Sequence, residues 1–301
     1  MTARTEAAAT GEAVALGQRV RARGLWSDAF QRLRRNRGAM IGLGILALLA
    51  IMAILAPLLA PEEPNLMISG DALKGPSAEY PMGTDQFGRD ILSRIIFGAR
   101  LSLQIGFIAV GIASAVGITL GMIAGYYGRW VDGVIGILID IMLAFPGILL
   151  ALAIVAILGP SLINLMVAVG IADVPRYARL IRGTVLSARE LTYVEAARVV
   201  GARDRMIMFR HIMPNVIAPA IVLATLGIGQ AILIGAAISF LGLGAKPPTA
   251  EWGAMLSSGR NFLQQAWWIT LFPGVAIMIT VLSINLLGDG LRDALDPRLR
   301  S

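Results

Sequence analysis

Long uncharged apolar blocks, separated by shorter polar stretches, dominate the pattern of this sequence. An α-helix rises about 1.5 Å per residue and needs roughly 20 apolar residues to cross a hydrocarbon core of about 30 Å. Five blocks meet this length plainly: residues 39–59, 101–124, 134–158, 216–241 and 267–287. Each block predicts a transmembrane helix.

A sixth block is shorter, because residues 161–172 are followed directly by Asp173, Pro175 and Arg176. The helix can still cross the bilayer if it continues over 161–185 with its arginines reaching toward the surface. The pattern therefore predicts an all-α membrane protein with six transmembrane helices. The composition agrees, since 56% hydrophobic residues and a mean hydropathy of +0.74 exceed what a soluble domain of 301 residues could bury.

The placement of lysine and arginine predicts the orientation, because cytoplasmic segments carry the excess of positive charge. With both termini in the cytoplasm, twenty of the 26 lysines and arginines lie on the inner side. We therefore expect a multi-pass membrane protein with an even number of spans and both termini in the cytoplasm. The basic residues lie between apolar blocks and are not clustered with aromatic residues, so the charge of +7 does not indicate nucleic-acid binding.

Residues 1–37 form a tail before the predicted membrane domain of residues 38–301. Within the stretch 27–40 and just before it, Trp26, Phe30 and Leu33 fall near one helical face, with arginines around them. This pattern favours an interfacial helix on the inner leaflet. The alternative is a solvated tail that only enforces the topology.

Small residues recur at a spacing of four in the second block, at Ala113, Gly117, Gly121 and Gly125. Such a stripe lets another helix approach the backbone closely. Helix packing is the favoured interpretation, and a pore-lining role is the alternative.

The predicted inner segment of residues 174–215 is too long and too basic for a simple connector, and its middle part, at about 190–214, carries a distinct pattern. Glu195, Ala196 and Ala197 open a helical stretch, Gly201 breaks it, and Pro214 begins the entry into the fifth span. We predict two short helices that meet at the glycine on the cytoplasmic surface.

These residues resemble the EAA loop of the binding-protein-dependent permeases of ABC importers. Further stretches, among them 83–90, 143–146, 175–179, 240–244, 251–255 and 287–293, are similar to the C-type permease of dipeptide, oligopeptide and nickel importers. The resemblance runs from about residue 26 to residue 299. It implies the type I importer permease fold and a coupling helix that docks on a separate ATPase. The coupling residues that it implies are Glu195, Ala196, Ala197, Arg198, Gly201, Ala202, Arg205 and Arg210.

The resemblance also implies the partners: a sister permease, two ATPase subunits that bind ATP and Mg²⁺, and an extracytoplasmic binding protein. The candidate docking residues for the binding protein lie in the two external segments and are Asp85, Arg89, Asp90, Glu251 and Trp252. The resemblance implies dipeptides or oligopeptides as the cargo and the cytoplasmic (inner) membrane of a bacterium as the location. A nickel chelate or another small cargo is the alternative within the family.

The chain itself is expected to be non-catalytic and to hold no cofactor or metal. A phosphate-binding loop ends in Gly-Lys-Ser/Thr, and the two lysines, Lys74 and Lys246, have no such context. One histidine, His211, and no cysteine leave no set of ligands for a metal site. The rival from another class is a secondary transporter or channel that works without ATP.

Polar residues inside the predicted spans are candidates for a cytoplasmic vestibule: Asp140, Pro146, Asp173, Arg176 and Arg179. A charge at the bilayer centre costs roughly 2.5 to 3.5 kcal/mol, so Asp140 has to face protein or water. It either pairs with Arg176 or Arg179 or lines the vestibule. Pro146 makes either a hinge or a static kink.

Overall fold

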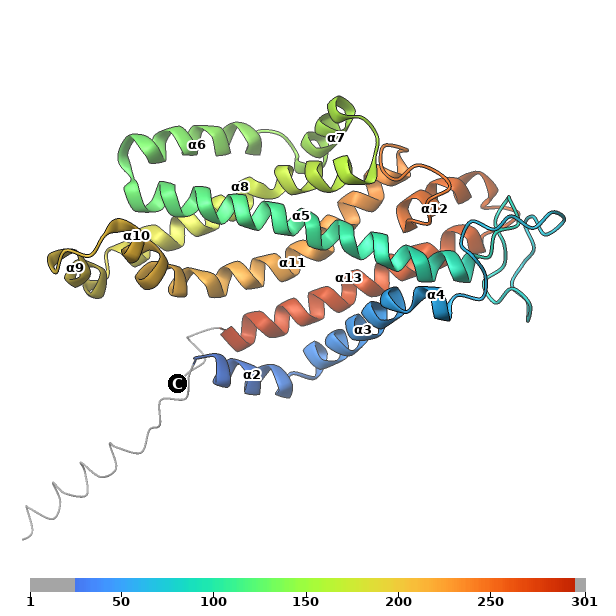
Figure 1. Ribbon diagram of the computed structural model, residues 1–301, viewed down its shortest axis with the longest axis horizontal. Coiled ribbons are helices and arrows are strands. Elements are labelled where there is room, and N and C mark those ends of the chain that lie inside the picture. Colours follow the sequence, from blue (N-terminus) through green and yellow to red (C-terminus); the bar gives the residue numbers. More distant parts are fainter. Residues whose placement is uncertain (1–24, 296–301) are drawn as a thin grey trace, which may run out of the picture.

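The structure is a computed structural model that describes residues 25–295 (Figure 1). Predictions for residues 1–24 and 296–301 lie outside the described residues, and the side chain of Trp26 lies outside the description as well. The described chain is an elongated bundle of helices without a β-strand (Figure 1). This confirms the all-α fold class.

The helices follow one another along the chain with short connections, except for two longer loops at one end of the bundle. They are α2 (Leu25–Arg35), α3 (Arg37–Ile54), α4 (Ala56–Leu59), α5 (Ile91–Tyr127), α6 (Arg129–Leu143), α7 (Gly147–Leu158), α8 (Leu162–Arg189), α9 (Thr192–Val199), α10 (Asp204–Met206), a π-helix (Ile207–Ile212), α11 (Met213–Phe240), α12 (Trp252–Gly259), a 3₁₀ turn (Arg260–Phe262) and α13 (Trp268–Leu295). We call the end that holds residues 60–90 and α12 the loop end. The end that holds α9 and α10 is the α9 end.

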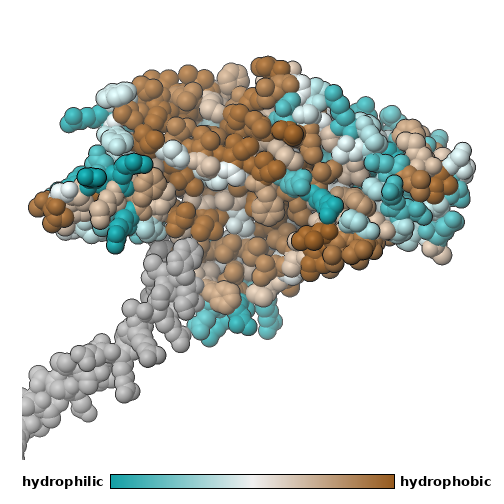
Figure 2. Space-filling model, viewed as in Figure 1, coloured by the Kyte–Doolittle hydropathy of each residue, from teal (hydrophilic) through white to brown (hydrophobic). Residues whose placement is uncertain are grey.

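Four helical segments of the described chain are long and apolar enough to cross a membrane: 37–54, 91–127, 204–240 and 268–295. The pair α6 and α7 makes a fifth if it counts as one span. A broad brown, apolar surface separates the more hydrophilic ends of the molecule in Figure 2. Since α8 is 28 residues long but carries Asp173 and several arginines, the count of six spans stays a prediction.

The second span begins earlier than its apolar block suggests, because α5 starts at Ile91 and not near residue 101. Asp90 ends the preceding loop and caps the helix, where its carboxylate accepts the backbone N–H of Ser93 at 2.7 Å. Arg94 and Arg100 therefore lie on the first turns of a 37-residue helix. The Arg100 side chain donates to the carbonyl oxygens of Ala53 and Ile54 and so satisfies the end of α3.

The third predicted span consists of two helices, since α6 and α7 meet at an angle of 91° (Figure 1). The break falls at residues 144–146, and Pro146 precedes the first residue of α7. Proline has no backbone N–H and disfavours a helical conformation of the residue before it, which explains the end of α6. The block predicted as a single span at 134–158 is thus divided at Pro146.

The stripe of small residues on α5 packs against α8, which confirms the packing interpretation. A methyl group added at Gly117 would lie 2.4 Å from Cβ of Tyr177, and one added at Gly121 would lie 2.5 Å from the carbonyl oxygen of Ala178. At Gly125 the nearest atom would be Cβ of Val185 at 2.8 Å. Glycine is therefore required for the two backbones to approach this closely.

The tail helix ends sooner than the predicted stretch 27–40. Asn36 separates α2 from α3 and caps α3, because its side-chain oxygen accepts the N–H of Ala39 at 3.1 Å. Leu33 of α2 lies beside Gly290 of α13. The helix is thus attached to the bundle, and its position on a membrane surface stays a prediction.

Candidate functional site

The loop between α8 and α11 forms the two short helices that the sequence predicts. Helix α9 ends in a Schellman motif: the N–H of Ala202 donates to the carbonyl of Ala197, and the N–H of Gly201 donates to that of Arg198, each at 3.0 Å. Gly201 takes a left-handed conformation with φ of +78°. The predicted break at Gly201 is confirmed, and its cause is the backbone conformation, because an added Cβ would meet open space.

One side of this loop is attached to the ends of α5 and α8 by an apolar cluster. Val194, Ile207 and Ile212 are fully buried against Met122 of α5 and Ile181 of α8, among others. Burial on this scale ties the loop to the helices instead of leaving it as a mobile connector.

Tyr126, near the end of α5, adds polar contacts to the same attachment. Its hydroxyl donates to Asp204 Oδ1 at 2.7 Å, and the guanidinium of Arg198 lies 5.6 Å from its ring centroid. Tyr126 thus binds residues on both sides of Gly201. Tyr126 was not predicted as a site residue, because it lies 78 residues from Asp204 and no local pattern joins the two.

The other side of the loop displays apolar side chains at the α9 end of the molecule. Val199 and Val200 are 83% and 82% exposed, and Phe209 is 60% exposed. Of the predicted coupling residues, Ala197 is buried and Ala202 is half-buried, whereas six are exposed: Glu195, Ala196, Arg198, Gly201, Arg205 and Arg210. Exposed valines rimmed by arginine are typical of a surface that another protein covers.

The candidate vestibule residues lie on α6 and α8 and at the break between α6 and α7. Arg179 and Asp140 form an ion pair at 2.8 Å, with side chains that are 62% and 70% exposed. The partner of Asp140 is therefore Arg179, which is one of the two arginines predicted for this pairing. A second pair, Arg182 with Asp132, lies nearer the start of α6. Asp173 is half-buried, and Arg176 and Pro146 are exposed.

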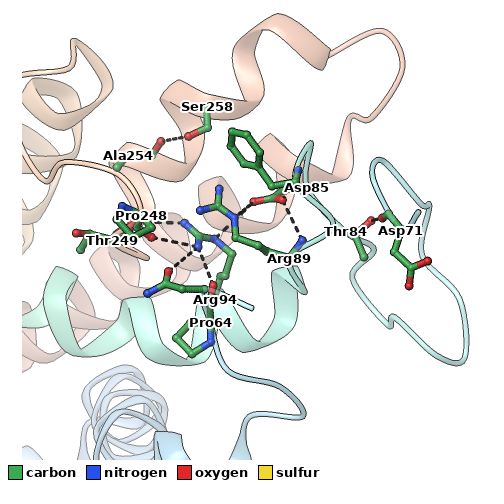
Figure 3. A network of polar contacts seen from close by, with 12 residues as sticks. Pro64, Asp71, Thr84, Asp85, Arg89, Arg94, Pro248, Thr249, Ala254 and Ser258 are labelled. Carbon is green, nitrogen blue, oxygen red and sulfur yellow. Dashed lines mark hydrogen bonds and ion pairs between the residues drawn. The ribbon is translucent and has the colours of Figure 1, made fainter. Parts of the chain in front are cut away.

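At the loop end, two arginines converge on one carboxylate (Figure 3). Arg89 Nε donates to Asp85 Oδ2 at 2.6 Å, and Arg94 lies 3.9 Å from the same oxygen. Arg94 also donates to the carbonyls of Pro64 at 2.8 Å and Pro248 at 3.3 Å. The network joins the two loops of the loop end to the start of α5, and all three charged side chains are buried.

Glu251 and Trp252 begin α12 and are buried as well. The Glu251 carboxylate accepts the backbone N–H groups of Gly253 at 2.8 Å and Ala254 at 2.9 Å. Burial raises the pKa of Glu251, and these two hydrogen bonds oppose that shift. The Trp252 indole donates to the carbonyl of Ile95 at 3.1 Å, which attaches α12 to α5.

The prediction of direct docking contacts needs correction. All five side chains proposed for contact with a binding protein are at most 4% exposed: Asp85, Arg89, Asp90, Glu251 and Trp252. They make their contacts inside this chain, so no partner reaches them in this conformation. Docking by the two external segments as a whole stays a prediction.

The comparisons with known proteins agree with one family along most of the chain. Residues 117–301 match the family model of the binding-protein-dependent transport system inner membrane component. Residues 24–76 match the N-terminal transmembrane domain of oligopeptide transport permease C.

Named relatives are similar over nearly their whole length. The dipeptide transport system permease protein DppC of Alkalihalophilus pseudofirmus is 55% identical over 92% of this chain and 91% of its own. The di/tripeptide transport system permease protein DppC of Pseudomonas aeruginosa is 48% identical over 91% and 92%. The glutathione transport system permease protein GsiD of Pectobacterium atrosepticum is 47% identical over 92% of each chain.

Among solved structures, an inward-facing form of the MetNI methionine ABC transporter has a similar fold. The TM-score is 0.55 at 18% identity, over 68% of this chain and 98% of that one. Together with the two family models, these similarities assign the chain. It belongs to the family of binding-protein-dependent transport system inner membrane components, as a non-catalytic permease subunit of an ABC importer.

Proposed function

We propose that this chain is the C-type permease subunit of an importer that moves dipeptides or oligopeptides into the cytoplasm at the expense of ATP hydrolysed by partner subunits. The observation that carries the proposal is the loop at the α9 end. It is anchored firmly to α5 and α8 on one side and displays Val199, Val200 and Phe209 on the other.

A displayed apolar surface on an anchored loop suits mechanical coupling to an ATPase. Exposed valines cost hydration free energy unless a partner covers them. Because the loop is buried against α5 and α8, a partner that moves it also displaces the ends of these helices. ATP and Mg²⁺ would be held by two ATPase subunits, each with a groove for such a loop.

This function orients the molecule. The α9 end lies in the cytoplasm together with both termini, and the loop end lies outside, where an extracytoplasmic binding protein delivers cargo. Helix α8 crosses the membrane as the fourth of six spans, with its charged face turned away from lipid. The Asp140–Arg179 ion pair is exposed on that face, where water or a protein partner can surround it. Contact of this pair with lipid tails would cost free energy, because charged groups are poorly solvated there.

The same face and a neighbouring cavity are the proposed vestibule. A cavity of about 570 Å³ lies between α8, α11 and α13 and is mostly apolar, with Asn215 and Arg292 among its polar lining. A sister permease would close the other side of the path. Relatives named for dipeptides, di/tripeptides and glutathione support a peptide cargo. A nickel chelate is the alternative within the family.

Two measurements test the proposal. Cells without this gene should lose ATP-dependent uptake of a labelled dipeptide and regain it on complementation. The tagged permease, purified in mild detergent, should carry ATPase subunits and a second permease in stoichiometric amounts. Purification without any ATPase, combined with ATP-independent uptake, would favour the rival secondary transporter or channel.

A further inference from the structure

The turn at residues 84–90 is a rigid frame at the loop end. The Asp85 carboxylate accepts the backbone N–H of Phe87 at 2.8 Å and that of Arg89 at 3.1 Å, in addition to the Arg89 side chain. A bridge between Thr84 and Asp90 closes the turn. Figure 3 shows Thr84, Asp85, Arg89 and Arg94 grouped at the base of this turn. Four buried groups thus hold a segment of seven residues in one conformation.

The neighbouring segment restrains the turn from another side. Gly88 has a φ of +74°, and a Cβ at this position would lie 2.3 Å from the carbonyl oxygen of Ile68. Glycine is required here both by the backbone conformation and by this close approach. The contact places the turn directly against the stretch that contains Leu66 and Met67.

Phe87 is the residue that this frame displays. Its side chain is 49% exposed, although every charged residue of the turn is buried. The Arg89 guanidinium lies 4.8 Å from the ring centroid and restrains the ring. Leu66 and Met67, on the adjoining segment, are 44% and 56% exposed. In Figure 2 this end is mostly hydrophilic, with a few apolar residues among the teal ones.

We propose that Phe87, with Leu66 and Met67 beside it, is the anchor on which the extracytoplasmic binding protein docks. This inference rests on the proposed function, which places the loop end outside. An aromatic ring already held in place loses little conformational entropy on binding, which is how a hot spot at an interface gains affinity. The buried charges that the sequence singled out would then support the contact without making it.

The surrounding charge indicates the chemistry of the partner surface. Residues 61–82 contain four carboxylates and one lysine, and Glu62, Glu63 and Glu79 are exposed. An apolar pocket rimmed by lysine or arginine on the binding protein would complement this surface. Lipid is a poorer occupant, because anionic headgroups would be repelled and the patch lies among hydrophilic residues.

The test uses the complete transporter in lipid nanodiscs and the purified binding protein of the same transporter as the probe. Phe87→Ala should raise the Kd by roughly tenfold or more, mainly through faster dissociation. Phe87→Tyr keeps the ring and should bind nearly as the unmodified chain does. Changing Glu62 and Glu63 to glutamine should instead slow association, with less dependence on salt.

A matched control is Phe107→Ala, because Phe107 is 61% exposed on α5 within the apolar part of the chain. It should leave both the Kd and the ATPase activity measured without binding protein unchanged. A Kd for Phe87→Ala within twofold of the unmodified transporter would overturn the anchor. So would a clear increase in quenching by brominated lipid in a Phe87→Trp variant, compared with the unmodified chain and its five tryptophans. If the unmodified transporter binds no binding protein at all, the proposed function itself fails.

Discussion

Replacing Gly201 with alanine separates a requirement for backbone conformation from a requirement for space. At φ of +78° a residue with a Cβ is strained by about 1–2 kcal/mol. An added Cβ has no atom of this chain within 4 Å, so steric conflict inside the chain contributes nothing. The expected effect is local: the ratio of molecules with the Schellman turn to molecules without it should fall by a factor of about 5–30.

A series of variants at this position gives a predicted order. Gly201→Asn should be mildest, because asparagine tolerates the left-handed region, and Gly201→Ala should be intermediate. Gly201→Asp should leave membrane insertion intact and abolish uptake, since it adds a carboxylate to the surface that would meet the ATPase. Gly183→Ala is the control, because Gly183 is an exposed glycine of α8 that also has open space around it.

The assay is ATP-dependent dipeptide uptake, with the amount of co-purified ATPase as a second readout. Both should fall in the order asparagine, alanine, aspartate, while the amount of inserted permease stays constant. Equal uptake by Gly201→Ala and the unmodified chain would refute the argument from φ. Loss of inserted protein in Gly201→Asp would show a folding defect and refute the coupling interpretation of that variant.

Three further predictions follow from the packing and the charges. Gly121→Ala should destabilise the permease by about 1–3 kcal/mol, because the added methyl group lies 2.5 Å from the Ala178 carbonyl oxygen. Gly111→Ala on the same helix has open space and should be neutral, and thermal unfolding in detergent compares the two variants. Tyr126→Phe removes the hydrogen bond to Asp204, which is worth about 1 kcal/mol, and should speed amide hydrogen exchange at residues 200–206 but not in α12. Unchanged exchange at residues 200–206 would contradict the role of Tyr126 in attaching this loop to α5. Burial raises the pKa of Glu251 above its ordinary 4.5, so the folded chain binds this proton more tightly than the unfolded chain does, and stability falls as the pH rises through the raised pKa. Glu251→Gln should flatten this fall, which is measured as melting temperature against pH. The same pH profile in Glu251→Gln and in the unmodified chain would contradict the assignment to Glu251.

Local patterns predicted the features that depend on local physics. The small-residue spacing on α5 indicated close packing because only a short side chain permits it, and Gly201 indicated a turn because glycine favours positive φ. Pro146 indicated a hinge or a kink, but within a single span predicted at 134–158. The 91° angle between α6 and α7 was not predicted, because both helices also pack against α8 and the local sequence does not encode that packing.

For the charged motif at 83–90, the sequence did not predict which side chains are buried and which are exposed. Asp85, Arg89 and Asp90 were predicted as contacts because they lie in a segment that was expected to face the binding protein. Their burial depends on Arg94 and on the carbonyls of Pro64 and Pro248, which come from distant segments. Phe87 reads as an ordinary apolar residue of the motif, and only the fold reveals that it is the exposed one.

Helix α5 links the two ends of the molecule, and its packing predicts how they move. Arg94 at one end joins the loops of the loop end, and Tyr126 at the other binds the loop at the α9 end. Between them α5 packs so closely against α8 that a methyl group added at Gly117 or Gly121 would lie 2.4 or 2.5 Å from an atom of α8. We therefore expect α5 and α8 to move as one body through the transport cycle. Spin labels on their exposed faces should keep a constant separation with and without ATP, and a change of several ångströms would show that the glycine contacts break during transport.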